Sequence, residues 1–179
     1  MINKDEACLV IVDVQGKLAE MVYDSERLLA NIERLVQAVT IFNVPILWLE
    51  QYPKGLGKTS EQIAQHLTHQ QPIEKIEFNA CLNAQFTNAL QQTARKQMIV
   101  CGIESHICVY QTAASLQQLG YEVEVVVDAV SSRTEANKRI GIDKMKAKGI
   151  APTATESVIY ELMARAGTPE FKQILPLIK

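Results

Sequence analysis

The feature that most constrains the fold is a run of six apolar residues near the start of the chain. Residues 7–12 read Ala-Cys-Leu-Val-Ile-Val without a break, and Asp13 follows at once. A strand that is apolar at every position is buried on both faces, and such strands occur in parallel sheets that helices cover on both sides. The run therefore predicts a layered α/β protein.

Strand-like and helix-like segments alternate along the rest of the chain. Between residues 24 and 42, apolar side chains recur every three or four residues, which predicts an amphipathic helix with Asp24 as its cap. We expect further strands at 44–49, 73–76, 97–101, 121–127 and 150–152. We expect further helices at 59–68, 81–94, 106–119, 135–148, from a capping box at Thr153–Glu156 to about Arg165, and at 168–177.

This alternation predicts one α/β domain over residues 1–179, a three-layer α/β/α sandwich around a six-stranded, mostly parallel, Rossmann-like sheet. The formal net charge is −2, with no block of like charges, so we expect no nucleic-acid partner. No apolar run approaches the roughly 18 residues of a membrane helix, and no leader segment is evident, so we expect no membrane partner and a cytoplasmic location. The four cysteines form no Cys-x-x-Cys pair and are expected to be free thiols.

Three reactive side chains stand where predicted strands end. Asp13 follows the first strand, Lys75 ends the third, and Cys108 lies just beyond the fourth. Ligands of parallel sheets bind beyond the carboxyl ends of the strands, so we expect an acid, a cation and a thiol in one cleft, the parts of a covalent hydrolase. Taken singly, each has a structural interpretation as well: a turn cap, a surface lysine and a buried thiol.

Cys108 is expected in the first turn of a helix, where free amides and the helix dipole favour a thiolate. Lys75 would hold two negative groups together and lower the pKa of the thiol. Asp13 would act as the general base that accepts the thiol proton.

Three segments of the chain resemble motifs of the isochorismatase-like cysteine hydrolase superfamily. They are Asp13-Val14-Gln15, Lys75 ahead of Phe78-Asn79-Ala80-Cys81, and Gly102 to Val109 followed by Gln111-Thr112-Ala113. Residues 50–57, residues 128–133 and the closing residues 171–179 are similar to the isochorismatase-domain-containing branch. The resemblance covers nearly the whole chain and implies an Asp13–Lys75–Cys108 triad.

The resemblance also implies a cis peptide bond between Ile103 and Glu104, with an oxyanion hole made by the amides of Glu104 and Cys108. It implies a small-molecule amide or acyl substrate and a homo-oligomer. The residues we expect to contact substrate are Gln15, Tyr52, Phe78, Ile103 and His106.

Nicotinamidases of this superfamily bind a metal through an Asp-x-His pair, and here the matching stretch is Glu50-Gln51-Tyr52. Without imidazole ligands we expect no metal, and no other cofactor. The expected activity is metal-independent hydrolysis through a Cys108 thioester. Two alternatives stay open: a binding or oligomeric scaffold with an unused triad, and isochorismatase-type hydrolysis of a vinyl ether. The roles of Arg133 and of the 51–58 loop also stay open.

Overall fold

The computed structural model describes residues 1–178 and contains one six-stranded sheet. Its strands are β1 (Ala7–Val12), β2 (Ile46–Gln51), β3 (Ile73–Lys75), β4 (Gln97–Ile103), β5 (Glu122–Ser131) and β6 (Ala151–Thr153). They lie in the order β3-β2-β1-β4-β5-β6, and every neighbouring pair is parallel. The predicted parallel α/β sheet is confirmed.

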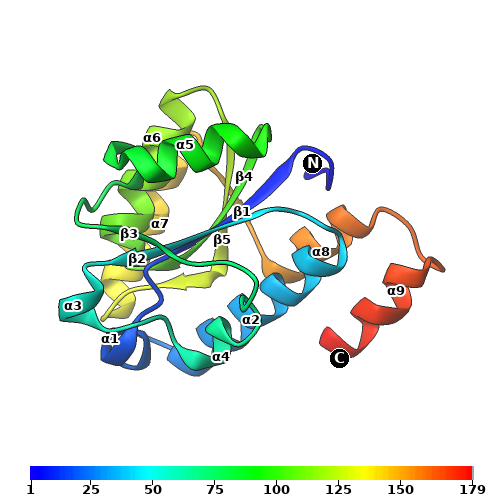
Figure 1. Cartoon of the computed structure of the whole chain (residues 1–179), viewed down its shortest axis with the longest axis horizontal. Helices are drawn as coiled ribbons and strands as arrows, with labels where there is room; N and C mark the ends of the chain where they lie inside the picture. Colours follow the sequence, from blue (N-terminus) through cyan, green and yellow to red (C-terminus); the bar gives the residue numbers. More distant parts are fainter. Residues whose placement is uncertain (179) are drawn as a thin grey trace.

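Helices cover both faces of the sheet (Figure 1). One face carries α2 (Ser25–Ile41), α8 (Thr155–Met163) and α9 (Pro169–Ile174), and the other carries α5 (Ala84–Thr93), α6 (Tyr110–Gln118) and α7 (Glu135–Ala147). Shorter turns are α1 (Gly16–Met21), α3 (Pro53–Leu56), α4 (Glu61–Ala64), the 3₁₀ turns η1 (Ala80–Leu82) and η3 (Leu175–Leu177), and the π-helical turn η2 (Ser105–Val109). Within residues 1–178, no helix combines the length and apolarity needed to cross a bilayer.

Strand β1 shows why the sheet needs both layers. Its side chains alternate, so Leu9 and Ile11 pack in the core beneath α2 and α8, whereas Val10 and Val12 pack in the core beneath α5 and α6. All six residues of β1 are fully buried. The unbroken apolar run therefore reflects one strand that serves two cores.

Local capping differs from the sequence-based expectation. Asp24 precedes α2 in a left-handed conformation (φ 53°), and its side chain makes no capping hydrogen bond. Helix α8 begins at Thr155, so Thr153 does not open a capping box. Instead, Asp128 Oδ1 accepts hydrogen bonds from the backbone N–H and the hydroxyl of Thr155, at 2.8 and 3.0 Å. The first residue of α8 is therefore capped by a carboxylate of β5 and not by a side chain from its own segment.

Two element boundaries also differ in ways that matter for the site. Helix α1 was not predicted; it begins three residues after Asp13 and turns the chain away from the end of β1. The predicted helix at 106–119 begins as the π-helical turn η2, which holds Cys108, and becomes α-helical only at Tyr110. β5 runs past the predicted end at residue 127 to Ser131, which brings the next two residues beside the end of β4.

Candidate active site

The carboxyl ends of three strands bring Asp13, Lys75 and Cys108 to one edge of the sheet. Asp13 follows β1, Lys75 is the last residue of β3, and Cys108 lies in η2 after β4. Their exposed fractions are 3%, 2% and 6%, so all three groups are shielded from bulk water. Charges in such a place interact far more strongly than on an open surface.

Asp13 and Lys75 form a buried ion pair, in which the Lys75 ammonium donates to Asp13 Oδ2 at 2.8 Å. The other oxygen, Oδ1, is buried and has no hydrogen-bond partner among the described residues. A buried acceptor without a donor is rare in folded proteins and marks a place where a proton can be received. The pair therefore leaves one carboxylate oxygen free.

Cys108 and Asp13 influence each other's pKa. Burial raises the pKa of Asp13, and Lys75 opposes that rise. Burial, followed by the negative charge of Asp13, raises the pKa of Cys108 to about 12, against a smaller lowering effect of Lys75. Lys75 does lower the pKa of the thiol, as expected from the sequence, but burial outweighs it, so the pKa of Cys108 lies above its ordinary value and not below it.

The segment before Cys108 is shaped by close backbone contacts. Gly102 has a φ of +116°, and a Cβ at this position would lie 2.1 Å from the carbonyl oxygen of Val12, so only glycine fits. The peptide bond between Ile103 and Glu104 is cis. The Glu104 carboxylate is 8% exposed and accepts hydrogen bonds from the backbone N–H and Nε of Arg133, at 3.0 and 3.2 Å. Sequence reasoning left the role of Arg133 open.

A second network fixes η2 from the side of β5. The Ser132 hydroxyl lies 3.0 Å from His106 Nδ1 and 2.7 Å from the Ser105 hydroxyl. A Cβ at Gly141 of α7 would lie 2.4 Å from the carbonyl carbon of Ser105. Helix α7 therefore packs directly against the backbone of η2.

The predicted substrate contacts fall into two groups. Gln15 and Ile103 are fully buried, Ile103 within the core and Gln15 in hydrogen bonds to Gln51 and Gly57, so the structure does not present them to a ligand. Tyr52 and Phe78 are about half exposed (54% and 56%), and His106 is partly exposed. The second group remains available for contact with a substrate.

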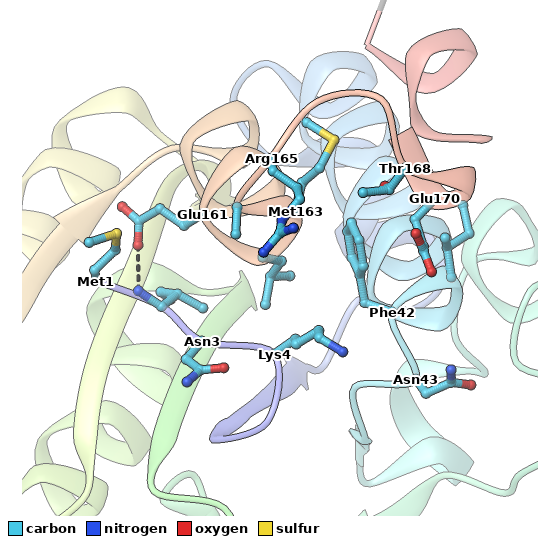
Figure 2. Close-up of a pocket in the computed structure, with 14 residues that line it drawn as sticks. Met1, Asn3, Lys4, Phe42, Asn43, Glu161, Met163, Arg165, Thr168 and Glu170 are labelled. Atoms are coloured by element: carbon cyan, nitrogen blue, oxygen red, sulfur yellow. Dashed lines mark hydrogen bonds between the residues drawn. The ribbon is translucent and has the colours of Figure 1, made fainter. Parts of the chain in front are cut away.

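Of two cavities in the structure, the smaller one reaches the candidate site. A cavity of about 340 Å³ reaches Lys75 at the edge of the sheet, between Tyr52, Ile76 and Asn83. A larger one, of about 600 Å³, lies where the amino-terminal residues meet the ends of α2 and α8 (Figure 2). It is lined by Lys4, Phe42 and Arg165 among others, but not by Asp13, Lys75 or Cys108. The larger of the two cavities is therefore not the one that reaches Lys75.

The stretch where nicotinamidases bind metal is occupied by protein contacts. Glu50 accepts hydrogen bonds from the backbone N–H and the hydroxyl of Thr59, both at 2.7 Å. Gln51 accepts one from the Lys75 ammonium at 2.7 Å. Across residues 1–178, no three histidine, cysteine or carboxylate side chains gather in a way that could hold a metal ion.

Comparison with known proteins identifies the family of this chain. The family model of the isochorismatase domain matches residues 7–157. The chain belongs to the isochorismatase family. Isochorismatase domain-containing protein 2 of Danio rerio is 33% identical over 171 residues, which are 95% of this chain and 85% of the relative.

Two solved structures show the same fold. The MAR1 ribonuclease of Caenorhabditis elegans superposes with a TM-score of 0.92 at 34% identity, over 99% of this chain and 91% of the other. The YcaC gene product of Escherichia coli, described as an octameric hydrolase of unknown specificity, gives a TM-score of 0.91 at 24% identity, over 98% and 89%. The family model and the shared fold thus agree in placing this chain in the isochorismatase family.

Proposed function

We propose that this member of the isochorismatase family is a metal-independent cysteine hydrolase that cleaves a C–N bond in a small amide-type substrate. The observation that carries the proposal is the unpartnered, buried Oδ1 of Asp13, with the Lys75 ammonium on the other oxygen and the Cys108 thiol within the influence of its charge. In this arrangement Asp13 removes the thiol proton as the sulfur attacks, so the free protein does not need to hold a thiolate.

The first half of the reaction forms a thioester. Asp13 takes the proton of Cys108 as Sγ bonds to the substrate carbonyl carbon, and the π electrons of the carbonyl move to its oxygen. The backbone amides of Glu104 and Cys108 hold this oxyanion, in the manner of other acyl-transfer enzymes. The C–N bond then breaks, and Asp13 returns its proton to the leaving amine.

The second half releases the acid. Asp13 takes a proton from water, and the oxygen of that water attacks the thioester carbonyl. The C–S bond breaks, and the proton held by Asp13 returns to Cys108. Throughout the cycle Lys75 keeps the buried charge of Asp13 balanced.

The decisive experiment is mass-spectrometric trapping of the acyl-enzyme with a panel of small amides, ureas and ureido acids. An adduct on Cys108 with the mass of the acyl group is expected, and Cys108→Ala should lower turnover by roughly 10³-fold or more. If Cys108→Ser retained turnover on a vinyl ether such as isochorismate, the acid-catalysed alternative would replace this one. No turnover in the whole panel would favour the scaffold.

The name of the Caenorhabditis elegans structure makes RNA a necessary substrate in the panel. The formal charge of −2 offers no excess of positive charge for a phosphate backbone, and the thiol is almost fully buried. We therefore propose a small-molecule substrate and no nucleic-acid partner, and RNA is expected to remain intact at enzyme concentrations that hydrolyse an amide.

We also propose a cytoplasmic homo-oligomer, for which the octameric Escherichia coli neighbour is the precedent. Light scattering on the purified protein measures its mass in solution, and a mass of one chain would contradict the proposed assembly. Cell fractionation tests the location.

A further inference from the structure

The Lys75 ammonium is surrounded by acceptors. It donates to Asp13 Oδ2 at 2.8 Å, to Gln51 Oε1 at 2.7 Å and to the backbone carbonyl of Glu77 at 3.2 Å. An ammonium group has three protons, so each is engaged. Lys75 therefore has no N–H left for a substrate, and it acts on the site through its charge and its position.

Gln51 is itself held rigidly. Its backbone N–H donates to Gln15 Oε1 at 2.6 Å, and its carbonyl accepts from Gln15 Nε2 at 3.1 Å. The carboxamide of Gln15 thus binds the main chain of Gln51 both as a donor and as an acceptor. Gln15 Nε2 also donates to the Gly57 carbonyl at 2.7 Å, so both amide hydrogens are engaged.

The side-chain amide of Gln51 has only one orientation that satisfies its neighbours. Its Nε2 donates to the Ile76 carbonyl at 2.8 Å, and its Oε1 faces an ammonium that can only donate. A flipped amide would set donor against donor at Lys75 and acceptor against acceptor at Ile76. Gln51 and Lys75 are also register partners across β2 and β3, so the contact is built into the sheet.

We propose that Gln51 is a positioning residue of the triad, which fixes the Lys75 ammonium on Asp13 Oδ2 and so leaves Oδ1 free for the thiol proton. Because its amide is neutral, Gln51 directs the cation without competing with Asp13 for it. Gln15 supports this role by fixing the main chain of Gln51. The inference rests on the proposed function, because it assigns Gln51 a task in the same proton transfer.

The test compares Gln51→Glu and Gln51→Met with Gln118→Met, which changes an exposed glutamine at the end of α6. In Gln51→Glu a second carboxylate shares the ammonium with Asp13. Asp13 already faces Lys75, Cys108 and the carboxylate of Glu50. The new charge should raise the pKa of Asp13 further, so the acid limb of kcat/KM should move up by about one pH unit or more.

In Gln51→Met the ammonium loses one acceptor and its fixed direction. We expect kcat to fall about tenfold or more while KM changes less than about twofold, because Gln51 does not touch substrate. Gln118→Met should match the parent in both constants. A normal kcat and pH profile in both Gln51 variants would overturn the proposal, and so would a raised KM at unchanged kcat, which would indicate a substrate contact.

A second measurement is independent of turnover. The rate of Cys108 alkylation by iodoacetamide, followed against pH by peptide mass spectrometry, reports the titration of the thiol, which faces Asp13, Lys75 and Glu104. We expect the Gln51→Glu profile to lie about half a unit or more above the parent's, because the variant adds a negative charge. A variant that fails to fold is recognised because all four cysteines then react rapidly.

The two measurements separate the two proposals. If no amide is hydrolysed but the alkylation profile still shifts in Gln51→Glu, the hydrolase assignment fails and the positioning role stands. If amides are hydrolysed and neither profile shifts, the positioning role fails and the hydrolase assignment stands.

Discussion

The carboxylate of Glu104 is held by Arg133 through two hydrogen bonds, one from the backbone N–H and one from the side-chain Nε. The contact joins the residue that follows β4 to the turn that follows β5. It fixes the chain at the point where the proposed oxyanion hole begins. The two partners are unequally exposed, because the Arg133 side chain is 58% exposed and the Glu104 side chain only 8%.

The two residues should therefore differ in their effect on stability. Arg133→Ala removes an exposed ion pair but keeps the backbone donor, and should lower the free energy of unfolding by at most about 1 kcal/mol. Glu104→Ala leaves the Arg133 N–H without its acceptor and should cost about 1–3 kcal/mol. Urea unfolding followed by circular dichroism measures both. An equal loss of unfolding free energy in the two variants would show that the hydrogen bond from the Arg133 backbone N–H contributes little.

Asp13→Asn should separate thiol reactivity from catalysis. The charge of Asp13 raises the pKa of Cys108, so its removal lowers that pKa and, at about pH 9, speeds alkylation by iodoacetamide. Amide hydrolysis should be lost, because asparagine accepts no proton. The three other cysteines, Cys8, Cys81 and Cys101, serve as internal controls. Slower alkylation of Cys108 in the variant would contradict the assigned influence of Asp13.

The pH dependence of hydrolysis follows from the raised pKa of Asp13. Because burial favours the protonated acid, the base is inactive until the pH exceeds a value above its ordinary 3.8. The value of kcat/KM should therefore fall on acidification at a higher pH than an exposed aspartate would give. A profile from pH 4 to 9 checks this. A flat profile down to about pH 4 would mean that Lys75 outweighs burial.

Gly141→Ala should damage the site from a distance. The new methyl group would lie 2.4 Å from the Ser105 carbonyl carbon and push η2, together with Cys108, away from α7. Overpacking of this kind costs about 1–3 kcal/mol, and kcat should fall with it. Ala136→Gly, an exposed change on the same helix, should cost about 0.5–1 kcal/mol and leave kcat unchanged. Equal kcat values in the two variants would contradict the prediction that displacing η2 slows the reaction.

Much of the fold was predictable because it depends on local periodicity. The apolar run of residues 7–12 and the spacing of 24–42 identify a buried strand and an amphipathic helix wherever they occur. The carboxyl ends of parallel strands share an edge, so the topology alone brings Asp13, Lys75 and Cys108 to the same side. Caps were less predictable, because Asp128, which binds Thr155, comes from another strand.

What the sequence determined by itself was the layered sheet and which reactive groups stand at its edge, because side-chain periodicity and strand order are properties of the chain. Only the tertiary structure decided that burial raises the pKa of Cys108, that Gln51 binds Lys75, and that Arg133 binds Glu104. A pKa depends on burial and on the distances between charges, and these pairs lie 24 and 29 residues apart in sequence. Their geometry exists only after the sheet has formed.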